Sequence, residues 1–213
     1  MKIATFGCSW TQGVPTIDKS YCWPKAIANA NPNWQVDNWA LAGSSLSFQA
    51  YLLDDVCKNN SNSYDKIIFQ ITSPNRLTYF DDALNYGTYL KQYNNYREFD
   101  RSGDIYRNFI VITPGHMKLP KHDSFWNYSD KHNFASLYYK YLNTSVQRTE
   151  YKAVIEYVKN KVDLIYFHNE DVCKIGNVPI LMDIVGDKFV ADEGDHFNKQ
   201  GSQWIADWVL ERI

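Results

Sequence analysis

The sequence predicts a three-layer α/β/α fold with a central, mostly parallel sheet. Short apolar segments typical of buried strands recur along the chain, and segments with helical periodicity separate them. This alternation is the pattern of a parallel sheet that helices cover on both faces. The length of 213 residues fits one sizeable domain. We therefore expect residues 1–213 to form a single domain, with an insertion at about 77–147.

The predicted elements follow one another in order. The strands are Lys2–Phe6, Gln35–Trp39, Lys66–Ile71, Val162–Phe167 and Ile180–Val185. The helices are Trp23–Asn29, Leu46–Cys57, Thr149–Lys159 and a last one from Asn198, with Trp204, Ile205, Trp208 and Val209 on one face. Ligands bind beyond the carboxyl ends of the strands in such sheets. We therefore expect the chemistry in the loops that follow the strands.

The alternation breaks in the span 77–147, which is unusually aromatic. The chain has 16 Tyr, 11 Phe and 7 Trp, and nearly half of them fall in this span. A loop of this length is normally functional or carries structure of its own. Two interpretations stay open: a small aromatic subcore over one edge of the sheet, or a cleft wall that stacks on a ligand such as a sugar ring.

Charge and composition exclude several classes of partner. The 22 Lys and Arg against 24 Asp and Glu give a net charge of −2, so we expect no nucleic-acid partner. No secretion signal and no membrane-spanning segment are visible, which predicts a soluble, cytoplasmic protein. The four cysteines lie far apart without a C-x-x-C pair, which favours reduced thiols, although two disulfides stay open. The sequence predicts no oligomeric state.

Two motifs at opposite ends of the chain carry the chemistry. Residues 6–13, Phe-Gly-Cys-Ser-Trp-Thr-Gln-Gly, come directly after the first strand and place Ser9 between two glycines that permit a tight turn. A serine nucleophile needs a base that is itself oriented by a carboxylate. Residues 191–201, Ala-Asp-Glu-Gly-Asp-His-Phe-Asn-Lys-Gln-Gly, supply His196 among three acids just before the last helix. The pair predicts nucleophilic catalysis.

Together these motifs resemble the SGNH, or GDSL-like, family of serine hydrolases. The family's first block is Gly-Asp-Ser-x-(Ser/Thr)-x-Gly, and here only the Asp is replaced, by Cys8. Its second block, a strand followed by a glycine loop, matches residues 38–45, and its last block matches residues 193–201 with Glu193 in place of Asp. The resemblance spans the chain apart from the aromatic insertion. It implies the flavodoxin-like, three-layer fold of that family.

The third block matches less well. The family has Gly-x-Asn-Asp after the central strand, and this chain has residues 71–76, Ile-Thr-Ser-Pro-Asn-Arg. Asn75 aligns with the family's oxyanion-binding Asn only after a shift of one residue. Thr72 or Ser73 is the alternative donor. Arg76 has two interpretations, a contact to an anionic group of the substrate or an ion pair with a nearby aspartate.

The resemblance implies a role for each matched residue. Ser9 attacks an ester carbonyl, His196 acts as the base, and Glu193 orients His196. Asp192 is the rival acid. The backbone N–H groups of Ser9 and Gly43 and the side chain of Asn75 hold the oxyanion.

The sequence also contains residues typical of two other chemistries, thiol nucleophiles and metal sites. Cys8 is a rival nucleophile, but adjacent residues at a strand end point in opposite directions, so only one of Cys8 and Ser9 can face the histidine. The family resemblance implies that Ser9 is the nucleophile, and we then expect Cys8 to be a small buried residue. The histidines at 116, 122, 132 and 168 lack the spacing of a metal site. We therefore expect no metal and no cofactor.

The sequence and the resemblance together predict a serine esterase that removes a small acyl group, acetyl in the first place, from a hydroxylated small molecule or glycan. An acyltransferase or lysophospholipase with the same site stays open. The alternative from another class is a non-catalytic module on a decayed hydrolase scaffold that binds a glycan or a protein partner.

Overall fold

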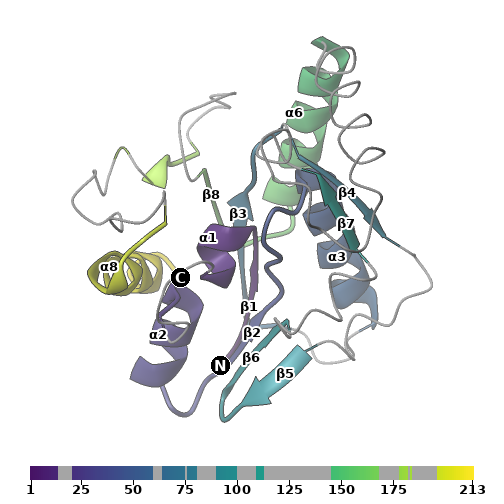
Figure 1. The fold of residues 1–213 in the computed structure, drawn as a ribbon. Helices are drawn as coiled ribbons and strands as arrows, with labels where there is room; N and C mark the ends of the chain where they lie inside the picture. Colours follow the sequence, from purple (N-terminus) through teal and green to yellow (C-terminus); the bar gives the residue numbers. More distant parts are fainter. Residues whose placement is uncertain are drawn as a thin grey trace, which may run out of the picture.

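A computed structural model describes residues 1–13, 21–59, 64–74, 76–80, 90–99, 109–112, 145–167, 178–181, 183 and 196–213. In these residues six strands form a central sheet in the order β5-β6-β2-β1-β3-β8 (Figure 1). The strands are β1 (Lys2–Phe6), β2 (Gln35–Asn38), β3 (Lys66–Ile71), β5 (Leu90–Tyr93), β6 (Tyr96–Phe99) and β8 (Leu164–Phe167). All neighbours are parallel except β5 and β6. The predicted mostly parallel sheet is confirmed.

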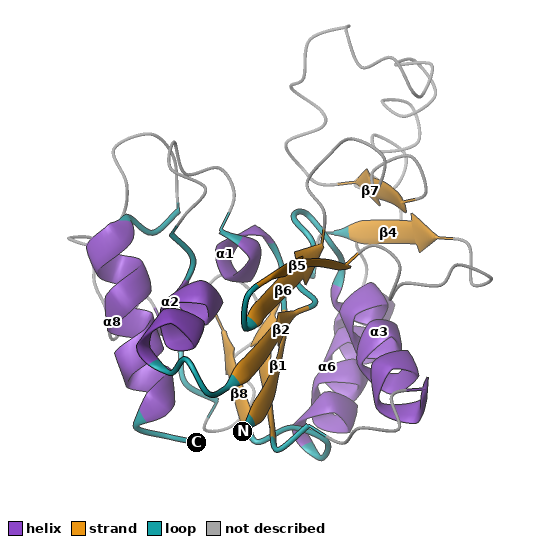
Figure 2. Cartoon of the chain, turned by 90° about the horizontal axis from the view of Figure 1, so that it is seen from below, coloured by secondary structure: helices purple, strands orange, loops and turns teal. Residues whose placement is uncertain are grey.

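Helices cover both faces of this sheet. The longer helices are α2 (Trp23–Ala30), α3 (Leu46–Asn59), α6 (Ser145–Lys159) and α8 (Lys199–Leu210). Figure 2 shows α2 and α8 on one face and α3 and α6 on the other. Successive side chains of a strand point to opposite faces, so Ile3 of β1 packs in the core under α2 and α8, whereas Ala4 packs in the core under α3 and α6. The three-layer α/β/α prediction is confirmed.

The last helix illustrates how the sequence specifies an element. Its N-cap residue, Asn198, accepts a hydrogen bond through Oδ1 from the backbone N–H of Gly201 at 2.8 Å. Ile205, Trp208 and Val209 are buried, as their predicted common face requires. Burying one large apolar side chain contributes about 1.5–3 kcal/mol, so this face stabilises the docking of α8 on the sheet.

The span 77–147 contributes strands of its own. β5 and β6 form an antiparallel hairpin, and β6 continues the central sheet by pairing in parallel with β2. A separate two-stranded antiparallel ribbon is formed by β4 (Leu77–Phe80) and β7 (Phe109–Ile112). Two aromatic residues of the span, Tyr96 and Phe99, belong to the two cores of the sheet. The central sheet therefore uses part of the aromatic span.

One predicted strand is wrong where the structure describes it. In Ile180–Val185, Leu181 and Asp183 are helical, and only Ile180 makes a single bridge. Apolar segments this short do not distinguish a buried strand from a buried helix by periodicity. The rest of this segment lies outside the described residues.

In the part of the chain that the structure describes, no helix has the length and apolarity that crossing a membrane requires. Cys8, Cys22 and Cys57 are free thiols. Cys173 lies outside the described residues. Cys8 is 2% exposed, so its prediction as a small buried residue is confirmed.

Candidate active site

Ser9 lies at the carboxyl end of the central strand β1. It is the first residue of a short helix, α1 (Ser9–Gln12), and the chain reaches it through Gly7 and Cys8. A Cβ atom on Gly7 would lie 2.6 Å from Thr11 Oγ1 and 2.7 Å from Gln70 Oε1. Only glycine therefore fits at position 7 without moving the turn.

A buried glutamine of the neighbouring strand supports this turn from below. Gln70 of β3 accepts hydrogen bonds through Oε1 from Thr11 Oγ1 at 2.6 Å and from the backbone N–H of Cys8 at 3.3 Å. Gln70 and Thr11 are both fully buried. Buried hydrogen bonds resist rearrangement because the donor and acceptor of a broken bond have no water molecule to bind in its place. Gln70 therefore anchors both the start and the middle of α1, on either side of Ser9.

The loop after β2 meets the same turn. Gly43 has a φ of 75°, a left-handed conformation that suits glycine. Next to it, the backbone N–H of Ala42 donates to Gln12 Oε1 at 2.8 Å, and Ser44 Oγ donates to the carbonyl oxygen of Gly7 at 3.2 Å. These bonds join the Gly43 loop to both ends of the Ser9 segment.

A second glutamine links the two loops. The backbone N–H of Gly7 donates to Gln49 Oε1 at 3.0 Å, and Gln49 Nε2 donates to Ser44 Oγ at 3.0 Å. Gln49 belongs to α3 and is fully buried. Hydrogen bonds thus connect the Ser9 and Gly43 loops to each other and to helix α3.

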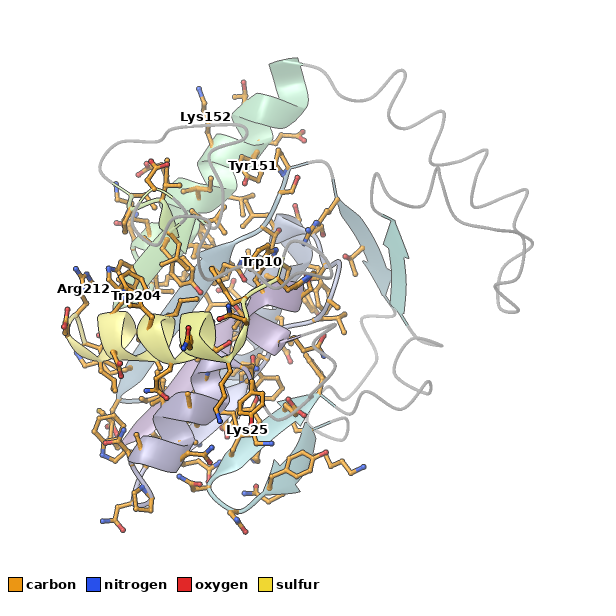
Figure 3. The ribbon with its side chains drawn as sticks, turned by 60° about the vertical axis from the view of Figure 1, so that its left-hand side comes forward. Trp10, Lys25, Tyr151, Lys152, Trp204 and Arg212 are labelled. Carbon is orange, nitrogen blue, oxygen red and sulfur yellow. The ribbon has the colours of Figure 1, made fainter. Side chains whose placement is uncertain are left out.

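His196 reaches this edge from the other end of the chain. Its imidazole stacks on the indole of Trp10, with ring centroids 4.8 Å apart and an interplanar angle of 20°. The ring of Phe197 meets the same indole edge-on at 4.7 Å. Trp10, labelled in Figure 3, packs against the core that α2 and α8 cover. The residue after Ser9 is therefore in direct contact with the predicted base.

A buried tyrosine lies in the core on this side of the sheet. Tyr166 of β8 is 1% exposed, and its ring packs edge-on against Trp23 and Trp208. Burial raises the pKa of its phenol well above the ordinary value. Tyr166 is therefore a neutral structural residue at physiological pH.

Of the residues that the sequence predicts for the site, the structure describes Ser9, Gly43 and His196. The Ser9 turn and the Gly43 loop lie side by side, and the histidine segment contacts the Ser9 turn. Glu193, its rival Asp192 and Asn75 lie outside the described residues, as do the histidines at 116, 122, 132 and 168. Thr72, the alternative donor, is 2% exposed, and its carbonyl oxygen accepts a hydrogen bond from the Tyr151 hydroxyl.

The sequence motifs do not predict the roles of Gln70 and Gln49. Gln70 interrupts an otherwise apolar segment, Lys66–Ile71, and a polar side chain in a buried strand needs a partner. That interruption is the one feature of the sequence that could have pointed to it. Gln49 lies in an amphipathic helix, in which polar residues are expected, so its sequence position gives no signal of this role.

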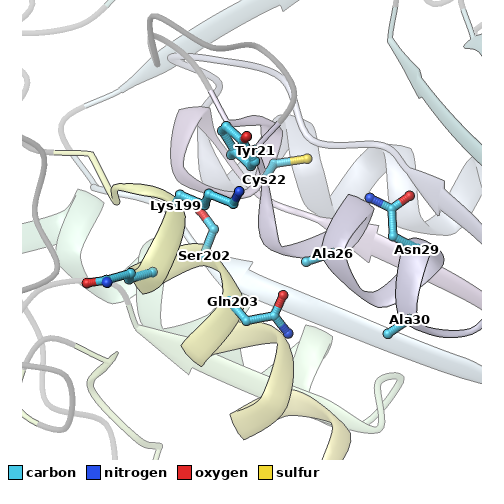
Figure 4. A pocket seen from close by; sticks show the side chains of 9 residues that line it. Tyr21, Cys22, Ala26, Asn29, Ala30, Lys199, Ser202 and Gln203 are labelled. Carbon is cyan, nitrogen blue, oxygen red and sulfur yellow. The ribbon is translucent and has the colours of Figure 1, made fainter.

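A groove runs between α2 and α8 beside this edge (Figure 4). Its volume is about 780 Å³, and its lining includes Tyr21, Cys22, Lys199 and Gln203. Lys199 Nζ lies 4.6 Å from the centre of the Tyr21 ring. The lining contains neither Ser9 nor His196, so this groove is separate from the predicted catalytic pair. Among the described residues, no three His, Cys, Asp or Glu side chains are grouped as metal ligands would be.

Comparisons with known proteins give structural similarities only. No family model matches the chain, and no curated protein sequence matches it. The chain is similar to a protein described as lipolytic, of the G-D-S-L family, from Desulfitobacterium hafniense DCB-2, with 14% identity, a TM-score of 0.41 and coverage of 100% of this chain and 99% of the other. It is also similar to TesA, with 11% identity, a TM-score of 0.42 and coverage of 100% and 97%. A third similar structure is a member of the lipolytic protein G-D-S-L family from Veillonella parvula DSM 2008, with 15% identity, a TM-score of 0.42 and coverage of 99% and 97%.

Proposed function

We propose that this protein is a serine esterase of SGNH type that hydrolyses a small acyl ester, acetyl above all, on a hydroxylated acceptor such as a glycan. The observation that carries the proposal is the stack of Trp10 on His196, at 4.8 Å between ring centroids. It brings the two motifs from opposite ends of the chain into contact beside Ser9. A serine nucleophile and its histidine base need this proximity.

In the proposed reaction Ser9 Oγ attacks the carbonyl carbon of the ester, and His196 takes the hydroxyl proton. His196 then returns this proton to the leaving alcohol, which leaves an acyl group on Ser9. Water then attacks the acyl-enzyme while His196 takes its proton. The bond between Ser9 Oγ and the acyl carbon breaks, His196 returns the proton to Ser9 Oγ, and the carboxylic acid is released. Glu193 orients His196, with Asp192 as the rival acid.

The proposed oxyanion hole combines the backbone N–H groups of Ser9 and Gly43 with the side chain of Asn75. The bonds that join Gln12 to Ala42 and Ser44 to Gly7 support the first two donors, because they keep the two loops in one arrangement. A preorganised donor of this kind contributes about 3 kcal/mol to transition-state stabilisation. The third donor rests on the family resemblance alone.

The choice of a small acyl group rests on the composition of the chain. The span 77–147 is rich in tyrosine and has few aliphatic residues, whereas a tunnel for a long acyl chain needs an aliphatic lining. The glycan acceptor rests on the remaining aromatic residues of this span, since Tyr96 and Phe99 serve the core.

The experiment is hydrolysis of p-nitrophenyl acetate by the wild-type protein and by Ser9→Ala. We expect turnover that falls by several orders of magnitude in the variant, since the nucleophile is gone. Ser202→Ala, a serine of α8, is the matched control and keeps its activity. Labelling with a fluorophosphonate, followed by peptide mapping, identifies the nucleophile independently. A label on any residue other than Ser9 would contradict the assignment.

Two further variants identify the acid. Glu193→Gln removes the proposed carboxylate without changing the size of the side chain, and Asp192→Asn does the same for its rival. We expect the larger fall in kcat from Glu193→Gln. A folded wild-type protein that hydrolyses no ester, takes no label and still binds a glycan would instead support the non-catalytic module.

A further inference from the structure

Arg76 follows β3 at the carboxyl edge of the sheet, the same edge at which Ser9 follows β1. These strands are parallel neighbours, with Phe6 of β1 paired with Phe69 of β3, so the loops after them leave the sheet side by side. The Thr72 carbonyl oxygen at the start of the Arg76 loop is held by the hydroxyl of Tyr151 from α6.

A second bond joins the Arg76 segment to the loop that carries Gly43. The backbone N–H of Ser45 donates to Thr78 Oγ1 at 2.8 Å, and both residues are buried. The preceding residue, Ser44, donates through Oγ to the carbonyl oxygen of Gly7. Arg76 is therefore two residues before Thr78, which contacts the loop that carries Gly43.

The guanidinium of Arg76 is partly buried and has no counter-ion among the described residues. Its Nη1 atom is buried and has no hydrogen-bond partner in the part of the chain that the structure describes. Two other arginines in the described part of the chain do have a counter-ion: Arg97 forms an ion pair with Asp37, and Arg212 forms one with Glu211. Burying part of a charged group without a partner is unfavourable, and an anion would offset this cost.

A second polar group in the same loop is also unsatisfied. Thr72 is 2% exposed, and its buried Oγ1 atom has no hydrogen-bond partner among the residues that the structure describes. Buried hydroxyl groups normally have a partner, so an isolated one calls for an explanation. The residues Thr72 and Arg76 thus each carry a buried polar atom without a partner among the described residues.

We propose that Arg76 binds an anionic group on the alcohol part of the ester, a carboxylate or a phosphate, so that the enzyme selects acidic acceptors. This inference rests on the proposed esterase function. The guanidinium is suited to the task because its planar set of N–H donors matches both oxyanions in a bidentate manner. Arg76 is thus a specificity-determining residue rather than part of the proton-transfer machinery.

The test compares three acetate esters whose alcohols differ in charge: neutral 2-hydroxyethyl acetate, the carboxylate acetoxyacetate and the phosphate 2-acetoxyethyl phosphate. Acid release is followed in a pH-stat for the wild-type protein, Arg76→Gln, Arg76→Lys and the control Arg212→Gln. We expect the wild type to favour one anionic ester over the neutral one in kcat/KM by roughly 10- to 100-fold. The favoured ester distinguishes a carboxylate site from a phosphate site.

Arg76→Gln should abolish this preference and leave the neutral ester nearly unaffected, while Arg76→Lys keeps part of it and Arg212→Gln keeps all of it. An equal loss on all three esters, or a wild type that favours neither anion, would overturn the inference. Circular dichroism and the melting temperature establish that Arg76→Gln is folded.

Binding separates this inference from the proposed chemistry. Isothermal titration calorimetry measures binding without turnover. Acetoxyacetate and 2-acetoxyethyl phosphate are each titrated into the Ser9→Ala variant and into the double variant Ser9→Ala with Arg76→Gln. Weaker binding of the favoured anion in the double variant supports the anion site even if the wild type hydrolyses no ester. Equal binding in both proteins overturns it, whatever the outcome for the esterase.

Discussion

The indole of Trp10 lies nearly parallel to the imidazole of His196, with 4.8 Å between the ring centroids. Trp10 follows the proposed nucleophile directly, so this contact ties the histidine to the segment that it must serve. Phe197 closes the arrangement by packing edge-on against the same indole. Three aromatic rings thus hold together two segments that lie near opposite ends of the sequence.

Replacing Trp10 with leucine should lower kcat on p-nitrophenyl acetate by about 10- to 100-fold, because a shift of the base by about 1 Å is enough for such a loss. Trp10→Phe keeps a flat ring and should retain most of the activity. KM should change little in both variants. Trp204→Leu is the control, since Trp204 lies farther along α8. A Trp10→Leu variant with unchanged kcat would show that the stack does not position His196.

Gln70→Leu should loosen the turn under Ser9. It leaves the hydroxyl of Thr11 and the N–H of Cys8 without their acceptor, and each unsatisfied buried group costs about 1–3 kcal/mol. We expect a lower free energy of unfolding in urea and slower fluorophosphonate labelling of Ser9. Gln203→Leu, a glutamine on the exposed side of α8, should change neither quantity. Slower labelling at unchanged stability would also support a positioning role, whereas normal labelling would contradict it.

The ion pair of Asp37 and Arg97 should contribute strongly to stability. The Asp37 carboxylate is fully buried and receives hydrogen bonds from Arg97 Nε at 2.7 Å and from the hydroxyl of Tyr64 at 2.7 Å. Arg97→Met leaves this charge without its partner, which should cost about 3 kcal/mol in urea unfolding. Lys66→Met breaks the more exposed pair with Asp163 and should cost less than about 1 kcal/mol.

A double variant, Asp37→Leu with Arg97→Met, separates charge from packing. It removes both charges, so it should recover most of the stability that Arg97→Met loses. If the double variant is as unstable as the single one, the loss comes from packing around Arg97 and the ion-pair explanation fails.

Acid should weaken the contact between α3 and the end of α6. Burial alone would raise the pKa of Asp54, but the hydrogen bonds from Lys161 and Tyr157 outweigh it and lower that pKa below the ordinary value. A lowered pKa in the folded state stabilises the fold above the pKa of the unfolded carboxyl, about 4, and this stabilisation disappears as the pH falls through the folded pKa.

Asp54→Asn should therefore be less stable than the wild type at neutral pH, with the difference shrinking below about pH 4. Thermal unfolding from neutral to acidic pH measures the difference. Asp207→Asn, an exposed aspartate of α8, serves as the control. A difference that stays constant with pH would show that the Asp54 charge is not responsible.

Much of the fold follows from local patterns. Two strands, Lys2–Phe6 and Lys66–Ile71, have the predicted bounds. A strand that is buried on both faces of a parallel sheet is a nearly continuous apolar segment, so its ends can be recognised in the sequence. The helix at Leu46 is two residues longer than its prediction, and helix ends are the least certain part of such predictions. The hairpin of β5 and β6 was missed because its edge strand, Leu90–Tyr93, is largely exposed and lacks an apolar pattern.

Local sequence patterns predict the three layers, the position of Ser9 after the first strand and the position of His196 before the last helix. Local periodicity and turn residues encode these features. Three contacts appear only in the folded chain: Trp10 stacks on His196, Gln70 supports the Ser9 turn from the next strand, and Thr78 accepts a hydrogen bond from the Gly43 loop. Contacts between distant residues depend on the order and register of the strands. Order and register are set only when the complete sheet packs against the helices on both of its faces.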